Sequence, residues 1–202
     1  MIKRGIYFAF TILIVIGMTL WWQSGSAVTY GAGIMAPGEP IQVNLTEIEA
    51  FEFRNYRLTP LADFEVNARV LSTKAYKRGR EADLSPVDLA LGWGRMSDEA
   101  VIDQISIRQL NRFYLWRAKQ LPIPQREIET HSANMHIIPS NRQIERELKR
   151  IRKGDLVTFS GKLVHVDASD GWRWTSSLTR TDTGNGACEL IFVESFEITT
   201  PD

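Results

Sequence analysis

The longest apolar run of the chain lies near its N-terminus, where residues 6–22 read IYFAFTILIVIGMTLWW. A helix rises ~1.5 Å per residue, so this run comes close to the ~30 Å thickness of a bilayer's hydrocarbon core. Lys3 and Arg4 precede the run, and no basic residue follows before Arg54. By the positive-inside rule this charge distribution keeps residues 1–5 in the cytoplasm. The pattern therefore predicts a single transmembrane helix.

Glycine, serine, alanine and proline are frequent just after this run. We interpret residues 23–54 as a tether that leads into a folded domain over residues 55–202. Two small residues, Gly25 and Ala27, leave a cleaved signal peptide as an alternative to the anchor. Both interpretations predict that the domain is extracytoplasmic.

Apolar spacing predicts the elements of the domain. Residues 64–71 alternate between apolar and polar side chains, as a half-buried strand does. Residues 141–153 repeat apolar side chains with helical spacing and stop before Gly154. A short helical turn is expected between Ser85 and Gly92. A helix is also expected at 97–104, and strands are expected at 112–118, 156–166, 172–178 and 188–198.

These elements predict an α+β fold, in which an N-terminal transmembrane helix precedes one mainly β domain. The strands are short, and Gly161 at the centre of one of them suggests a bend or bulge. The sheet is therefore expected to curl or to close into a small OB-like barrel with two or three short helices.

Composition narrows the possible functions. The chain has 24 basic and 24 acidic residues, so its formal net charge is zero. Such a balance creates no long-range field that attracts a polyanion, and no nucleic-acid partner is expected. Cys188 is the single cysteine, which excludes an intramolecular disulfide and a multi-cysteine metal site.

Two histidines, His131 and His136, lie close together in the sequence HSANMHIIP. Zinc requires imidazoles that converge on one point, but residues five apart on a strand point to opposite faces. A helix would not bring them to one face either, and the location of His165 is open. No metal or other cofactor is therefore predicted, and a histidine metal site is kept only as an alternative function.

Cys188 could act as a thiol nucleophile if a histidine lay within hydrogen-bonding reach. Gly184 and Gly186 precede it and could leave backbone N–H groups free to stabilise an oxyanion. The competing interpretation is a small buried residue at the start of a strand. Asp182 belongs to an Asp-Thr-Gly triplet, but one triplet supplies only half of an aspartic-protease site, and a turn explains it better.

Aromatic side chains are the remaining candidates for binding. Trp172 and Trp174 share one face of their predicted strand. Beside an arginine such as Arg180 they could stack on a sugar, a peptide or a lipid headgroup. The alternative is packing in the core, which also applies to Trp93 between two glycines.

Longer blocks of the sequence resemble a known family. The strings are PLADFEVNARVLS, GWGRMSD, HSANMHIIP and SSLTRTDTGNGACELIFVE. They are similar to those of small, membrane-anchored bacterial proteins for which no activity is established. The resemblance implies a single-pass protein of the bacterial inner membrane with its C-terminal domain in the periplasm. It transfers no catalytic residue.

The leading functional hypothesis is a membrane-anchored binding or accessory module of the cell envelope, with the membrane and a membrane protein as partners. Its binding surface is expected near Trp93, His131, Asn134, His136, Arg180 and Asp182. The alternatives are a thiol-dependent hydrolase or acyl-transfer enzyme that uses Cys188 with His131 or His136, and the histidine metal site.

Overall fold

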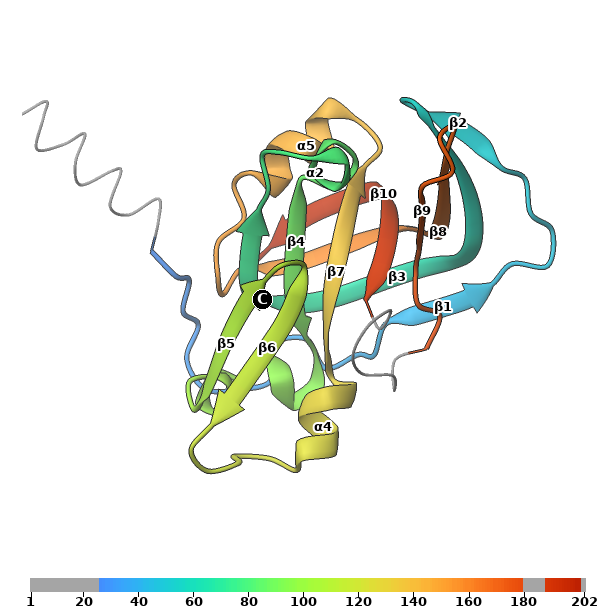
Figure 1. The fold of residues 1–202 in the computed structure, drawn as a ribbon. Helices are drawn as coiled ribbons and strands as arrows, with labels where there is room; N and C mark the ends of the chain where they lie inside the picture. The colour runs from blue at the N-terminus through green and yellow to red at the C-terminus, as the bar shows by residue number, and fades with distance from the viewer. Residues whose placement is uncertain (1–25, 180–187, 201–202) are drawn as a thin grey trace, which may run out of the picture.

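The computed structural model describes residues 26–179 and 188–200 (Figure 1). It is mainly β, with 48% strand, 16% helix and four short helices in its described part. The predicted α+β class is therefore wrong. One reason is the segment 87–92, where we expected a helical turn but all six residues form a fully buried strand. A strand that is buried on both faces lacks the alternation by which sequence reveals strands.

The elements follow the chain in a simple order. The strands are β1 (Ile41–Asn44), β2 (Phe51–Phe53), β3 (Tyr56–Ala75), β4 (Val87–Gly92), β5 (Ile105–Leu110), β6 (Phe113–Ala118), β7 (Ser132–Pro139), β8 (Leu156–Ala168), β9 (Arg173–Thr175) and β10 (Glu189–Thr199). The four α-helices of the described part are α2 (Arg80–Leu84), α3 (Glu99–Ile102), α4 (Gln125–Thr130) and α5 (Arg142–Leu148), and a 3-10 helix, η1 (Gly94–Ser97), precedes α3.

Five strands close into a ring. β3 pairs with β4, β4 with β7, β7 with β10, β10 with β8, and β8 again with β3. The β7–β10 pair is parallel and the others are antiparallel. Small OB-type barrels also have five strands. Here, however, a long insertion between β4 and β7 folds back against the outside of the barrel (Figure 1).

The barrel is filled by alternate residues of its strands. Phe64, Leu89, Met135 and Phe159 belong to one buried cluster inside it. Helix α5 adds Ile144 and Leu148 to the same cluster, which agrees with the helical spacing seen in the sequence. Its cap is Asn141, whose side chain accepts hydrogen bonds from two backbone N–H groups of the first turn.

Gly161 is required by close packing between strands. A side chain there would place its Cβ about 2.0 Å from the backbone oxygen of Phe192 on β10. The irregularity expected at this glycine lies instead in β10, where the register shifts between Val193 and Ser195.

The segment before the barrel is held against it. We call residues 28–36 the strap. Val28 donates its N–H to Lys153 O at 2.8 Å, and Gly94 donates its N–H to Ala36 O at 2.8 Å. The side chains of Ser97, Asp98 and Glu99 accept hydrogen bonds from five N–H groups of the strap. Residues that we interpreted as part of a tether therefore form part of the folded domain.

The described residues include no helix that is long and apolar enough to cross a membrane. The predicted transmembrane helix, residues 6–22, lies outside them. The predictions of a single-pass anchor, of an inner-membrane placement and of an envelope setting are therefore not supported. The physical reason is that an apolar run of sufficient length is compatible with a membrane helix but does not by itself establish one.

Candidate functional site

Several of the predicted site residues come together on the outside of the barrel. On β7, Met135 and Ile137 point into the core, so Asn134 and His136 point outward. In the parallel pair with β10, Leu190 lies beside His136, and Cys188 precedes that paired stretch by one residue. The ring of Trp174 lies 4.8 Å from that of His136. Asn134, His136, Trp174 and Cys188 therefore share one region.

Asp88 on β4 lies directly opposite His136 on β7. Its carboxylate is fully buried, and Oδ1 lies 3.0 Å from Nδ1 of His136, although the two groups are not aligned for a hydrogen bond. Arg112 reaches the same oxygen with Nη1 at 2.6 Å. We call Asp88, Arg112 and His136 the latch.

Arg112 lies at the tip of the β5–β6 hairpin. Asn111 and Arg112 both have positive φ values, 51° and 68°, as in the tight type I′ turn that joins two antiparallel strands. This turn directs the guanidinium back toward the barrel, where it also donates to Ser85 O at 3.0 Å. The guanidinium carbon lies 3.8 Å from the centre of the Tyr76 ring, a cation–π contact. The hairpin tip is therefore fixed to the barrel by charge and by stacking.

The latch is not fully paired within the described residues. Asp88 Oδ2 and His136 Nδ1 are buried and have no hydrogen-bond partner there. Burial and the Asp88 carboxylate raise the pKa of the Tyr76 hydroxyl above its ordinary value. A buried ion pair is costly to break, because the partner left behind becomes an uncompensated charge. The latch thus acts as a structural anchor.

The described contacts of Cys188 include one hydrogen-bond acceptor and one donor. Its Sγ lies 3.8 Å from Arg112 O, a backbone acceptor that only an S–H group can satisfy. Asn134 Nδ2 lies 3.7 Å from the sulfur on another side. The nearby imidazole of His136 packs against Trp174 and Asp88. A thiolate nucleophile is favoured by several donors or a cation directed at the sulfur, whereas the described contacts pair one amide donor with one backbone acceptor.

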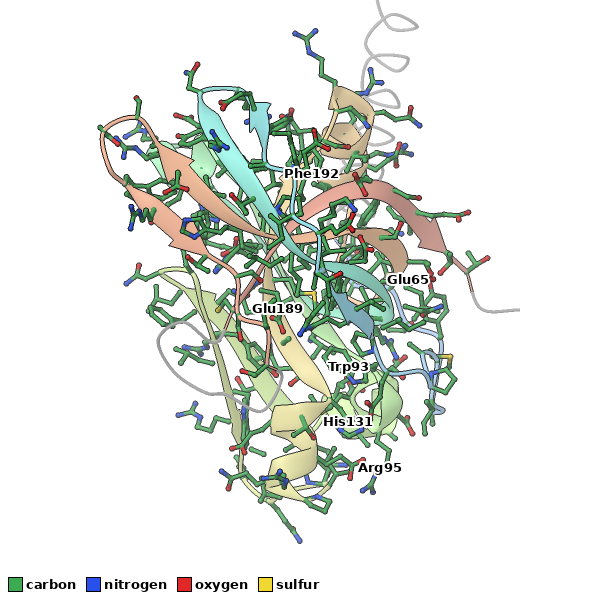
Figure 2. The ribbon with its side chains drawn as sticks, turned by 90° about the vertical axis from the view of Figure 1, so that its right-hand side faces the viewer. Glu65, Trp93, Arg95, His131, Glu189 and Phe192 are labelled. Carbon is green, nitrogen blue, oxygen red and sulfur yellow. The ribbon has the colours of Figure 1, made fainter. Side chains whose placement is uncertain are left out.

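His131 and Trp93 lie elsewhere, at the opposite end of β7. Trp93 is buried and donates its N–H to His131 O at 3.0 Å. The His131 ring packs so closely that a Cβ at Gly94 would meet its Cδ2 at 2.8 Å. Figure 2 shows both residues toward one end, apart from Glu189. The strand rise of ~3.3 Å per residue separates His131 from His136 by about 16 Å, so the two histidines cannot act on one substrate atom.

The other candidates have structural surroundings. Trp172 and Trp174 pack against a buried cluster and against each other, with ring centroids 6.0 Å apart. His165 contacts Thr175 and Asp167. Within residues 26–179 and 188–200 there is no group of three or more His, Cys, Asp and Glu side chains that could hold a metal ion. Arg180 and Asp182 lie outside the described residues.

The most distinctive surface belongs to the β5–β6 hairpin, which we call the arm. Its inner residues, such as Ile107, Tyr114 and Trp116, pack on the outside of the barrel. Burial raises the pKa of Tyr114 to about 12, and its hydroxyl lies 3.1 Å from Ser132 Oγ. Figure 1 shows the arm as a separate two-stranded unit beside the barrel.

The outer face of the arm is apolar near its tip. Leu110, Phe113 and Leu115 are 60%, 41% and 53% exposed. Leu110 lies opposite Phe113, and Arg108 lies opposite Leu115.

The sequence analysis did not predict β5 and therefore did not predict this exposed face. Apolar and polar residues alternate only from Ile105 to Arg108, and Gln109 and Leu110 break the pattern, so the sequence carried only a short signal for this strand.

No protein-family model matches the chain, and no curated protein or solved structure shows a significant match to it. The arrangement of its side chains is therefore the basis for any functional assignment.

Proposed function

We propose that this protein is a non-catalytic binding module that recognises another protein through the outer face of the arm. The observation that carries this proposal is the exposure of Leu110, Phe113 and Leu115 on adjacent strands. Exposed apolar side chains that cluster in this way mark interaction surfaces more often than isolated ones do. An aromatic side chain with aliphatic neighbours is also a common anchor in protein interfaces.

Two further features support the proposal. The latch and the apolar inner face hold the arm in one position, and a preorganised surface loses little conformational entropy on binding. Arg108 and Arg117 flank the apolar residues on the outer face and form no ion pair within the described part of the chain. A partner with an apolar centre and acidic neighbours therefore fits this face.

The test is photo-crosslinking of the full chain in its native cells. A photoreactive amino acid replaces Ser106, which lies on the same outer face beside the apolar residues. The expected result is a protein adduct that disappears when Leu110, Phe113 and Leu115 are all changed to serine. These residues are exposed, so each change should alter the stability of the fold by no more than ~0.5 kcal/mol.

The matched control carries the photoreactive group at Arg173, an exposed position on β9. It should not give this adduct. The same adduct from both positions, or an adduct that persists in the triple serine variant, would contradict the proposal.

A further inference from the structure

A shallow groove lies beside β1. Figure 1 shows β1 on a different side of the domain from the arm. It has a volume of about 260 Å³ and is lined by residues of β1, β3, β8 and β10. Ile41 and Val43 contribute exposed apolar side chains, 60% and 58% accessible. Glu65, which is labelled in Figure 2, and Asp63 stand opposite them on β3.

The groove carries an excess of negative charge. Asp63, Glu65 and Glu194 line it. The neighbouring cation is Lys162, whose Nζ lies 2.7 Å from Asp63 Oδ1. The hydrogen bond to Asp63, with weaker attraction from Glu194, raises the pKa of Lys162. Glu65 forms no ion pair with any other described residue.

We infer that the partner of the arm is a second copy of this chain, which receives the arm in this groove. This inference rests on the proposed function of the arm. Both surfaces alternate apolar and charged side chains across neighbouring strands. On the arm Leu115 lies opposite Arg108, and in the groove Ile41 lies opposite Glu65. Both pairs have the spacing of adjacent strands, ~4.8 Å, so apolar residues can meet while Arg108 approaches Glu65.

The contact is heterologous, because it joins two different surfaces of the same chain. The arm and the groove lie on separate sides of one domain, so a molecule cannot occupy its own groove with its own arm. Within the described residues, each copy leaves both its arm and its groove accessible. Repetition of the contact therefore produces a ring if the rotation closes and an open chain if it does not.

The experiment uses two differently tagged full-length copies in the same cells. The donor copy carries the photoreactive group at Ser106 and has its groove disabled by Ile41→Ser, Val43→Ser and Glu65→Lys. The receiving copy has a wild-type groove and an arm disabled by the triple serine change. The expected result is an adduct between the two tags, with the attached peptide mapped to residues 41–65.

Disabling the groove of the receiving copy should reduce this adduct by about tenfold. Glu52→Lys in the receiving copy, an exposed change on β2 outside the groove, should leave it unchanged. A charge exchange sharpens the test further. Arg108→Glu in the donor should weaken the adduct, and Glu65→Arg in the receiver should restore it.

Each outcome separates the two proposals. An arm-dependent adduct with a different protein, and none between the tags, overturns self-association and leaves the binding function of the arm in place. An adduct between the tags that does not depend on the receiver's groove also overturns this inference. The absence of any arm-dependent adduct overturns both.

Discussion

The strap and the arm both lie against the barrel, but different parts of the chain hold them. The strap is held through its own backbone, because Tyr30 and Gly31 donate N–H groups to the Glu99 carboxylate at 2.9 and 3.0 Å. The arm is held through its side chains, with apolar residues along its inner face and Arg112 at its tip. The side chains that accept hydrogen bonds from the strap belong to Ser97, Asp98 and Glu99, which lie in the segment inserted between β4 and β7.

This difference explains why the sequence misled about the two segments in different ways. A strap that is recognised through its N–H groups can consist of glycine and alanine, and such a composition resembles a flexible tether. The arm is held through its side chains, but polar Gln109 faces inward and apolar Leu110 faces outward, so its strand pattern is incomplete in the sequence. The comparison predicts that substitutions of the arm's own side chains will disturb its docking. Docking of the strap should instead be disturbed by substitutions in the residues that contact it.

The largest expected effect follows from breaking the latch. Asp88→Ala leaves the mostly buried Arg112 guanidinium without its buried carboxylate, and its other partner is Glu81, a half-exposed carboxylate 3.6 Å from Nε. We expect a loss of about 3 kcal/mol in the free energy of unfolding, as for other buried pairs that lose one partner. Urea unfolding measures it. The control is Asp103→Ala, an exposed carboxylate after α3, which should cost less than ~0.5 kcal/mol. Equal losses in the two variants would show that the latch does not hold the arm.

A smaller effect is expected where the strap crosses the end of the barrel. Gly154 has a φ of +94°, and a Cβ there would lie 1.9 Å from Val28 O. Gly154→Ala should therefore displace the strap and cost more than the ~1 kcal/mol of a left-handed alanine. Hydrogen exchange should become faster at Tyr30 and Gly31.

Gly171→Ala is a matched control, because Gly171 has a φ of +88° and no atom within 4 Å of the added Cβ. It shares the backbone strain but lacks the clash. If both alanine variants left exchange in the strap unchanged, the contact between Gly154 and Val28 would not matter for docking.

The smallest expected effect is a dependence of folding stability on acidic pH, caused by the Glu99 carboxylate that binds the strap. The hydrogen bond from Arg69 and that from the Tyr30 N–H hold the pKa of Glu99 below its usual value. The unfolded chain therefore binds a proton at higher pH than the folded one. The stability from this group is complete above the unfolded pKa of ~4.3 and is lost as the pH falls through the folded pKa.

Glu99→Gln should therefore reduce the fall in urea midpoint between about pH 6 and about pH 3. Some dependence should remain, because the pKa values of Glu127 and Glu145 are also lowered by their cationic partners. An unchanged pH profile in the Gln variant would mean that Glu99 is not a significant acid-sensitive contact of the strap.

The sequence determined local features of this protein. The spacing of Ile144 and Leu148 predicted α5, and alternation at residues 64–71 predicted the central part of β3. These signals are local, because each depends on which side of one element faces the core. The sequence suggested Cys188 with His131 or His136, but residue spacing gave no information on the backbone acceptor, Arg112 O, that lies beside the sulfur.

Only the tertiary structure decided the rest. The ring of five strands depends on pairings between distant segments, such as β3 with β8, which no local pattern encodes. The latch joins Asp88, Arg112 and His136 from three separate elements. The strap is ordered by hydrogen bonds to residues more than 60 positions away. Sequence periodicity reports how one element faces the core, whereas these contacts arise when the closed barrel brings remote backbone and side-chain groups within hydrogen-bonding distance.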